Sequence, residues 1–248
     1  MLILQSIAWI FTPANWVSVN AGLGIGGEIG AHLFLTAVSL LVAALIAVPI
    51  GLAIGHTGRG RGVAIVVGNT VRAFPTLGLL SILLLMLGLN LIPTVAVFVL
   101  LGIPPLLAGA YAGVEAVDRQ TIDAARAMGM TEWQVLGKVE LPLAAPLLLG
   151  GLRSAALQII ATVALVSEFG TDSLGQFIIA GEATQDYVQM IGGAILVTVL
   201  ALIADALLAT AQRLTVPRGV PRGVGGRTTA RGRRILTAPS GAPISEGN

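Results

Sequence analysis

Residues 31–54 read AHLFLTAVSLLVAALIAVPIGLAI and contain no aspartate, glutamate, lysine or arginine. As a helix with about 1.5 Å of rise per residue, this stretch would be about 36 Å long, enough to cross a hydrocarbon core of about 30 Å with some tilt. It has neither a basic flank before it nor a cleavage site after it, so it differs from a signal peptide. The whole sequence is 55% hydrophobic and only 10% charged, whereas about a quarter of the residues in a soluble domain are charged. These features predict an all-α, multi-pass protein of the cell (inner or plasma) membrane.

Further apolar segments of similar length follow along the chain. A spanning helix needs about 20 residues, and each of these segments has a length near that. Together with the first stretch they predict five transmembrane helices: 31–55, 63–88, 91–112, 145–167 and 188–211. Several contain proline, which membranes tolerate where neighbouring helices or a water-lined cavity satisfy the freed backbone groups. Both a bundle around a pathway and ordinary kinks would explain Pro49, Pro75, Pro104 and Pro105.

The placement of basic residues predicts the orientation, because lysine and arginine near helix ends are retained on the cytoplasmic side. No basic residue precedes Arg59, and none lies between the fourth and fifth predicted spans. Apart from Arg72 and Arg153, which lie within or at the edge of a span near its predicted cytoplasmic end, the basic residues follow the first span, separate the third from the fourth, and follow the fifth. We therefore expect the amino terminus outside and the carboxyl terminus in the cytoplasm.

The two ends of the chain differ from the predicted transmembrane domain, residues 31–212. Residues 1–30 are predicted to form an external interfacial segment: a helix on the outer surface over 1–20, with a sixth crossing as the alternative, and then a glycine-rich joint. Trp9 and Trp16 suit a membrane interface. Residues 213–248 are basic and rich in Pro, Gly and Arg, and we expect a disordered cytoplasmic tail that attracts anionic lipid or binds a partner.

The long segment between the third and fourth spans, residues 113–146, is predicted to form a helix, a turn and a second helix in the cytoplasm. Asp118 can cap the first helix, and Gly129 suits the left-handed residue that ends it. Thr131 and Gln134 form a capping box for the second helix, which Pro142 and Pro146 are expected to bound. From the residues alone, this segment is either a surface that a partner grips or a linker that packs under its own bundle.

Within this segment the sequence resembles the signature loop of bacterial ABC importer permeases, which is Glu-Ala-Ala, three residues, Gly, nine residues, Ile, any residue, Leu-Pro. The spacing is kept, and the two departures are Asp123 for Glu and Val139 for Ile. The resemblance implies a type I importer fold in which this coupling loop enters a groove of a cytoplasmic ATP-binding subunit. The residues that it assigns to ATPase docking are Asp123, Ala124, Ala125, Gly129, Met130, Thr131, Trp133, Leu141 and Pro142.

The resemblance extends over residues 30–212 and is strongest to osmoprotectant permeases. It is carried by residues 71–77 (VRAFPTL), 102–105 (GIPP), 151–155 (GLRSA) and 202–205 (LIAD). It implies import of glycine betaine, choline, carnitine or proline, delivered by an external solute-binding protein, through a pore shared with a second copy or a homologous permease. Methionine-type permeases share similar pieces, so another small solute is the alternative, and a stand-alone secondary transporter or channel is a different class. Residues 171–175 (TDSLG) depart from the Gly-Gly-Leu-Gly that is common in relatives.

A few polar residues fall within or at the edge of predicted spans, where they are candidates for the translocation path or for intramembrane contacts: Arg72, Thr76, Gln158, Glu168 and Asp205. Asp205 is a functional candidate, but a structural ion pair with Arg72, Arg153 or Arg213 is the favoured alternative. His32 and His56 have no partner at ligand spacing and are expected to be interfacial.

The sequence contains no motif for catalysis. The only lysine, Lys138, is followed by Val139, so no Gly-x-x-x-x-Gly-Lys-Ser/Thr loop is present and ATP hydrolysis is expected on a partner that binds ATP and Mg²⁺. Cysteine is absent, and no metal, cofactor or nucleic-acid site is predicted. Aromatic residues make up only 4% of the chain, too few to expect a cage for a quaternary ammonium group. Affinity for solute is therefore expected in the external binding protein.

Overall fold

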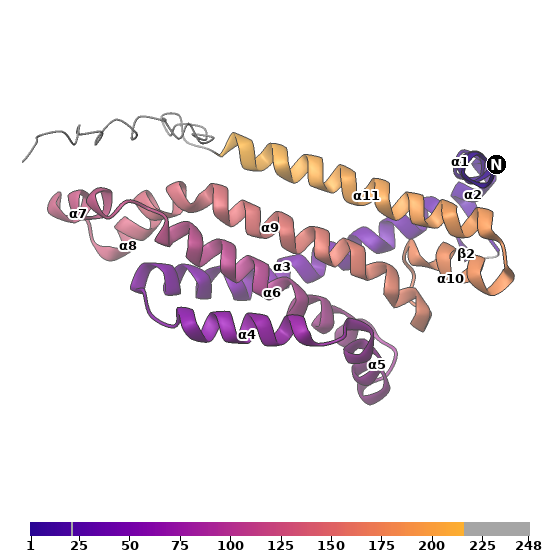
Figure 1. Cartoon of the computed structure of the whole chain (residues 1–248), viewed down its shortest axis with the longest axis horizontal. Helices are drawn as coiled ribbons and strands as arrows, with labels where there is room; N and C mark the ends of the chain where they lie inside the picture. The colour runs from indigo at the N-terminus through magenta and orange to yellow at the C-terminus, as the bar shows by residue number, and fades with distance from the viewer. Residues whose placement is uncertain (21, 216–248) are drawn as a thin grey trace, which may run out of the picture. The chain divides into compact units, whose positions relative to one another are not determined.

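The computed structural model describes residues 1–20 and 22–215, which fall within one unit of the chain, and most of them are helical. The elements in chain order are α1 (Leu2–Ile10), α2 (Pro13–Val17), β1 (Ser18–Val19), β2 (Gly22–Leu23), α3 (Ile25–Thr57), α4 (Arg61–Ala73), α5 (Thr76–Leu87), α6 (Leu91–Glu115), α7 (Arg119–Ala127), α8 (Glu132–Val135), the π-helical segment η1 (Leu136–Glu140), α9 (Leu141–Val163), the 3-10 segment η2 (Ala164–Phe169), α10 (Gly175–Thr184) and α11 (Tyr187–Leu214). Figure 1 shows their arrangement.

Among the described residues, four helical segments are long and apolar enough to cross a membrane. They are α3, α6, the continuous helix Glu132–Phe169 and α11, and they contain four of the five predicted spans. The bent pair α4 and α5 gives a fifth if it is counted as one span. The predicted all-α architecture of up to five spans is therefore confirmed.

The predicted span over 63–88 is not one straight helix. α4 and α5 meet at an angle of 82°, and the two residues between them, Phe74 and Pro75, both have extended backbone, with ψ values of 133° and 116°. The ring of a proline disfavours helical backbone at the preceding residue, which accounts for the break. By contrast, Pro49 lies inside α3, and Pro104 and Pro105 lie buried inside α6, without ending either helix.

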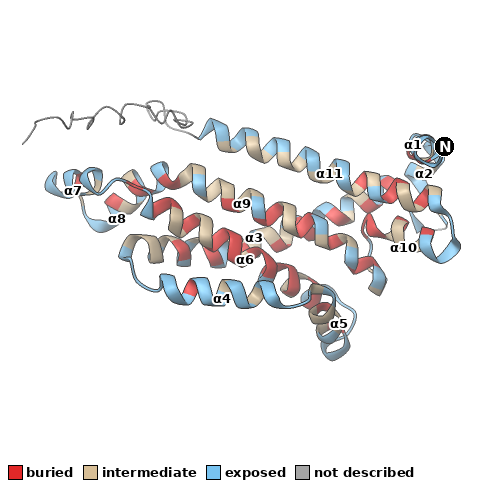
Figure 2. Ribbon diagram, viewed as in Figure 1, coloured by how far each residue is buried: buried red, intermediate tan, exposed pale blue. Residues whose placement is uncertain are grey.

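α6 is the central helix, and small residues bring its neighbours close to it. It is the most enclosed of the spans, whereas α11 is the least enclosed (Figure 2). A Cβ on Gly51 of α3 would lie 2.6 Å from the Cβ of Ala110 of α6, and one on Gly109 of α6 would lie 2.8 Å from the Cα of Gly151 of α9. Close backbone approach of this kind replaces the hydrophobic effect as the basis of helix packing in lipid.

In the described part of the amino-terminal region, residues 1–20 and 22–24, no helix is long enough to be a sixth crossing. α1 has 9 residues, so it is about 14 Å long, less than half the thickness of the hydrocarbon core. Trp9 packs edge-on against Phe177 of α10, with ring centroids 5.4 Å apart. The predicted glycine-rich joint over 21–30 is wrong in part, because α3 already begins at Ile25. The basic tail beyond residue 215 lies outside the described residues.

Two features around the fourth span differ from prediction. Pro142 and Pro146 do not end the second helix of the 113–146 segment, because helical structure continues from Glu132 to Phe169. The turn at η1 is widened, with the Leu141 N–H donating to the Leu136 carbonyl five residues earlier, and Pro142 follows at the start of α9, where a missing N–H is tolerated. The short helix α10, which packs on α11, was not predicted.

Candidate functional site

The first helix of the 113–146 segment begins and ends as its sequence predicts. The Asp118 carboxylate accepts a hydrogen bond from the Gln120 N–H at 3.1 Å, which caps α7. At the other end, Gly129 has a φ of 84°. The Gly129 N–H donates to the Arg126 carbonyl at 2.9 Å, and the Met130 N–H to the Ala125 carbonyl at 3.2 Å. This pair of bonds is the Schellman pattern, so the turn after α7 is fixed by backbone geometry.

The second helix starts at a capping box. The Thr131 N–H donates to the Gln134 side-chain oxygen at 2.9 Å, and the reciprocal Thr131 contact is also present. Within α8, the Val135 side chain is buried, whereas the Trp133 side chain is 83% exposed. α7 and α8 are therefore a folded pair with a defined outward face.

A bidentate ion pair joins the two helices. Arg126 of α7 donates from Nε and Nη2 to the two carboxylate oxygens of Glu132 of α8, at 3.0 and 2.9 Å. This hydrogen bonding raises the pKa of the Arg126 guanidinium above its ordinary value. Asp123 lies 3.7 Å from Arg126 and adds to the same cluster. Such forked geometry fixes orientation more than it adds stability at an exposed site.

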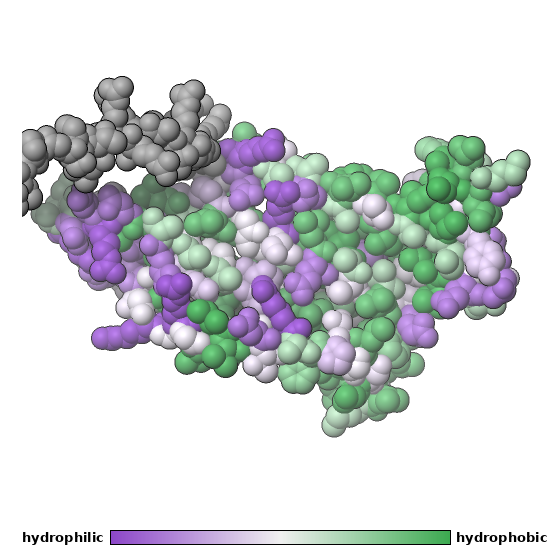
Figure 3. Space-filling model, in the orientation of Figure 1, coloured by the Kyte–Doolittle hydropathy of each residue, from purple (hydrophilic) through white to green (hydrophobic). Residues whose placement is uncertain are grey.

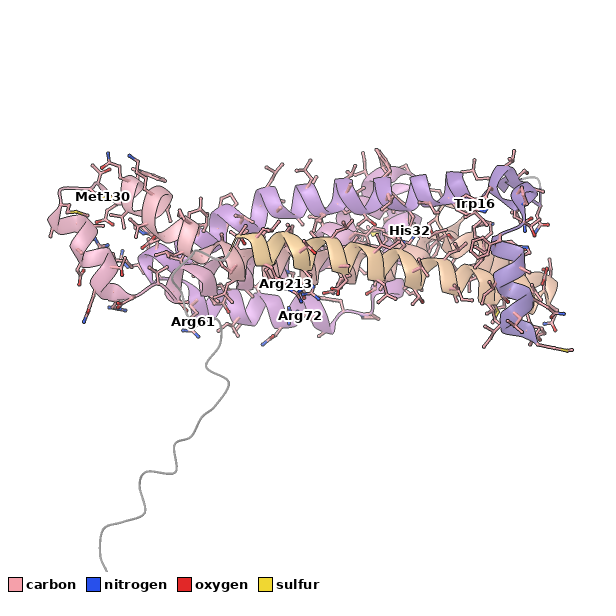
Figure 4. The ribbon with its side chains drawn as sticks, turned by 90° about the horizontal axis from the view of Figure 1, so that it is seen from above. Trp16, His32, Arg61, Arg72, Met130 and Arg213 are labelled. Carbon is pink, nitrogen blue, oxygen red and sulfur yellow. The ribbon has the colours of Figure 1, made fainter. Side chains whose placement is uncertain are left out.

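Most of the predicted docking residues are exposed. Asp123, Ala124, Gly129, Thr131 and Trp133 are exposed, Met130 is half-buried and Ala125 is buried against the segment itself. Met128, which was not predicted, is 77% exposed beside them. Leu141 and Pro142 are exposed but lie on α9, beyond η1. Figure 3 shows hydrophilic residues gathered at the end of the bundle that carries α7 and α8, and Figure 4 places Met130 there, at the opposite end from Trp16.

Behind α7 lies a cleft of about 600 Å³ lined by charged and polar residues, among them His56, Arg61, Glu115, Arg119, Asp123 and Glu140. His56, at the end of α3, lies 2.6 Å from Glu140 and 3.2 Å from Glu132. The expectation that His56 is an interfacial residue gave no sign of these two carboxylate contacts. No sequence pattern gives this contact, because Glu140 is 84 residues away along the chain.

The intramembrane acid Asp205 forms a structural ion pair. Arg153 of α9 donates from Nε and Nη2 to the two oxygens of Asp205 of α11, at 2.6 and 2.7 Å. The favoured alternative for Asp205 is thus observed, with Arg153 as the partner rather than Arg72 or Arg213. A second polar contact, from the Gln212 amide to the Pro146 carbonyl at 2.8 Å, also joins α11 to α9.

The other intramembrane candidates come from three further elements and from α9. Arg72 is exposed near the end of α4, Thr76 begins α5, Gln158 is half-buried in α9 and Glu168 is exposed in η2. In the part of the chain that the structure describes, neither Arg72 nor Glu168 forms an ion pair. His32, predicted to be interfacial, is instead fully buried, with Nε2 3.0 Å from the Ile160 carbonyl. It belongs to the interior of the bundle.

The 171–175 stretch, which departs from the pattern common in relatives, forms a tight turn before α10. The Ser173 hydroxyl is buried, lies 2.8 Å from the Ser167 hydroxyl and accepts the Gly175 N–H at 3.2 Å. A Cβ on Gly175 would collide with the Ala164 carbonyl. Gly175 is therefore required by close backbone approach, and Ser173 holds the turn through its hydroxyl.

Known structures with the same fold are importer permeases. The chain in inward-facing conformations of the MetNI methionine ABC transporter superposes with a TM-score of 0.67, with 21% identity over 78% of this chain and 96% of that one. A crystal structure of an amino acid ABC transporter with histidines gives a TM-score of 0.62, with 24% identity over 76% of this chain and 92% of that one. At this level of identity the likeness concerns the fold.

Curated proteins of similar sequence are permeases of osmoprotectant systems. The glycine betaine/carnitine/choline transport system permease protein OpuCB of Bacillus subtilis is 31% identical over 79% of this chain and 92% of its own length. The carnitine transport permease protein OpuCD of Listeria monocytogenes is 34% identical over 77% of this chain and 86% of its length. The osmoprotectant import permease protein OsmY of Salmonella typhimurium is 33% identical over 76% of this chain and 81% of its length.

The sequence pattern of one protein family covers most of the chain. The family described as binding-protein-dependent transport system inner membrane component matches residues 47–218, which include α7, α8 and all spans from the middle of α3 onward. Together with four or five apolar spans, this match shows a multi-pass inner-membrane protein. The chain belongs to the family of binding-protein-dependent transport system inner membrane components.

Proposed function

We propose that the chain forms half of an import pore that a separate ATPase drives from the cytoplasm. The observation that carries this proposal is the α7–α8 segment: a folded helical pair with a fixed turn at Gly129 and an exposed apolar face, including Trp133 at 83% exposure and Met128 at 77%. Large apolar side chains exposed together on a polar end of a protein favour a partner surface. A stand-alone transporter would have no use for this surface.

Each predicted docking residue has a role in this proposal. Trp133 and Met130 enter a groove of the ATPase, and Gly129 and Thr131 shape the turn between α7 and α8. Asp123 and Ala124 contact the rim of the groove, and Ala125 packs inside the segment. Leu141 and Pro142, at the start of α9, pass the movement into the span. The continuous helix from Glu132 to Phe169 supports this path, because a helix without a break transmits a displacement along its axis.

We further propose that α7 and α8 face the cytoplasm and that α1 and α2 lie on the outer surface. The distribution of basic residues supports this orientation. The partners are then a cytoplasmic ATPase that binds ATP and Mg²⁺, a solute-binding protein at the outer end, a second permease copy or homologue across the pore, and the surrounding lipid. Little of α11 is buried against the rest of the chain, so a long apolar face of this helix is available to lipid or to a second permease.

For the solute, we propose an osmoprotectant of the glycine betaine, choline, carnitine or proline class. The names of three relatives with 31 to 34% identity support this class. Methionine is the second candidate, because the methionine transporter shares the fold, although at only 21% identity. The charge of Glu168 near the outer end of η2 would attract a cationic head group, and Arg72, Thr76 and Gln158 are further candidates for the path.

Two measurements test the proposal. Purification of the detergent-extracted chain from its native membrane is expected to bring down an ATPase with a phosphate-binding loop, and its absence would contradict the docking role. Cells that express the system are expected to take up labelled glycine betaine or choline, with uptake rising at high external salt. Uptake of methionine alone would overturn the osmoprotectant class but leave the importer in place.

A further inference from the structure

His56 lies at the end of α3, and both of its ring nitrogens face carboxylates. Nδ1 is 2.6 Å from Oε2 of Glu140, and Nε2 is 3.2 Å from Oε2 of Glu132. The Nδ1 contact meets the geometry of a hydrogen bond, whereas the Nε2 contact lies within ion-pair distance and is attractive when the ring is protonated. The His56 and Glu140 side chains are only 15% and 3% exposed. The contact is therefore shielded from water, unlike an ordinary surface ion pair.

The two carboxylates lie on either side of the π-helical segment η1. Glu132 is in the first turn of α8, and Glu140 is the last residue of η1. The Leu141 N–H reaches back five residues to the Leu136 carbonyl, so this turn is wider than the α-helix on either side. η1 is therefore a place where the continuous helix Glu132–Phe169 departs from α-helical geometry. His56 spans it from outside.

Displacement of α8 reaches the bundle through two connections. One is the helix itself, through η1 into α9. The other is the His56 contact to α3, which packs so closely on α6 that a Cβ on Gly55 would lie 2.7 Å from the Cβ of Val114. α9 approaches α6 in the same way at Gly109 and Gly151. Close-packed helices of this kind move together rather than slide.

We propose that His56 is a positioning residue for energy coupling: by joining Glu132 to Glu140 across η1, it braces the widened turn, so that α8, α9 and α3 move as one body when the ATPase displaces the α7–α8 segment. This inference rests on the proposed function. Glu132 also holds Arg126 of α7, so the brace includes both helices of the segment.

The same cleft contains a matched control. Arg61 of α4 pairs with Glu115 of α6 at 3.2 Å, and both residues line the cleft together with His56. This pair joins two elements of the bundle and does not include α7 or α8. Its loss removes a charge contact in the same cleft, although a more exposed one, without releasing the turn at η1.

The test uses the complete transporter, reconstituted with its ATPase and binding protein in lipid vesicles. ATP hydrolysis and uptake of radiolabelled glycine betaine, choline or methionine, whichever the wild type imports, are measured in the same preparation. For His56→Ala we expect the solute imported per ATP hydrolysed to fall about tenfold, equivalent to about 1.4 kcal/mol of coupling. The amount of bound ATPase should stay at the wild-type level. A residue needed only for folding would lower yield, hydrolysis and uptake in proportion and leave the ratio unchanged.

Three further variants make the result specific. His56→Asn keeps one donor near the position of Nδ1, so its ratio is expected between those of the wild type and His56→Ala. Glu132→Gln alters a side chain that is 57% exposed, so it should fold normally and show a reduced ratio even if His56→Ala does not accumulate. Arg61→Ala is expected to keep the wild-type ratio.

If Glu132→Gln and every His56 variant that assembles import as much solute per ATP hydrolysed as the wild type, the inference is overturned and the proposed function stays intact. An equal loss in Arg61→Ala would also overturn it, because the effect would then belong to the cleft in general. If the wild-type preparation contains no ATPase or shows no ATP-dependent uptake, the proposed function itself fails, and this inference fails with it.

Discussion

Gly129 ends α7 with a φ of 84°, and no atom lies within 4 Å of the place where its Cβ would be. A larger side chain therefore has room, and only the backbone conformation opposes it. A β-branched residue in the left-handed region is destabilised by about 1–2 kcal/mol, whereas asparagine tolerates this region. We expect Gly129→Val to abolish uptake with normal membrane insertion and Gly129→Asn to keep most of it, as measured by solute uptake beside membrane protein level. Equal uptake by both variants would show that the turn has no part in coupling.

The Arg153–Asp205 pair yields a prediction about stability. Removal of one partner leaves the other charge unpaired within an apolar span, so Asp205→Ala should lower the melting temperature of the protein. Replacement of both residues by apolar ones of similar size, Arg153→Met with Asp205→Leu, should recover most of this loss. Thermal denaturation in detergent measures both effects. A double variant no more stable than Asp205→Ala, yet normal in uptake, would contradict a structural pair of this kind.

At the scale of elements, the sequence predicts local features well and contacts between distant segments poorly. The cap at Asp118, the turn at Gly129 and the capping box at Thr131 were predictable, because each depends on residues within a few positions of one another. The contact between His56 and Glu140 depends on two helices meeting in space, and no local pattern encodes it.

The effect of a proline on its helix is equally hard to predict from local sequence. Pro75 breaks a predicted span by 82°, whereas Pro104 and Pro105 lie buried within the continuous α6, although each of these prolines disfavours helical backbone before it. Packing on both sides of α6 maintains the helix, and α4 and α5 have mostly exposed surfaces that do not. Pro49 is exposed and also leaves its helix, α3, unbroken, so a proline in the sequence does not by itself predict where a span bends.

The α7–α8 segment is the element that the account assigns to the ATPase, and its exposed tryptophan tests this assignment. Truncation of a central aromatic residue at an interface weakens the free energy of binding by about 2 kcal/mol or more. We expect Trp133→Ala to reduce the ATPase that co-purifies by about tenfold or more, with an unchanged melting temperature of the isolated chain. Leu89→Ala serves as the control, since Leu89 is 75% exposed in the turn between α5 and α6. A similar loss in the control would point to a general effect of exposed apolar surface.

At the scale of the whole molecule, the spans were predictable because apolar length is a property of each segment by itself. The orientation of the spans in the membrane rests on charge placement alone, and it can be tested directly because the chain contains no cysteine. We expect a membrane-impermeant maleimide to label Ala14→Cys in intact cells and to label Gln120→Cys only after permeabilisation. Both positions are exposed, Ala14 on α2 and Gln120 on α7, and these two helices lie at opposite ends of the bundle (Figure 1). The reverse pattern would invert the topology and place α7 and α8 outside, where no ATPase could reach them.

The most direct test of an ATP-driven pore is the energy source of uptake in vesicles that contain the chain, its ATPase and the binding protein. The account predicts that uptake of labelled solute requires ATP on the side of α7 and α8, persists when ion gradients are collapsed, and stops when the catalytic site of the ATPase is inactivated. Uptake that continues without ATP and follows an ion gradient would contradict it and would assign the chain to the secondary transporters.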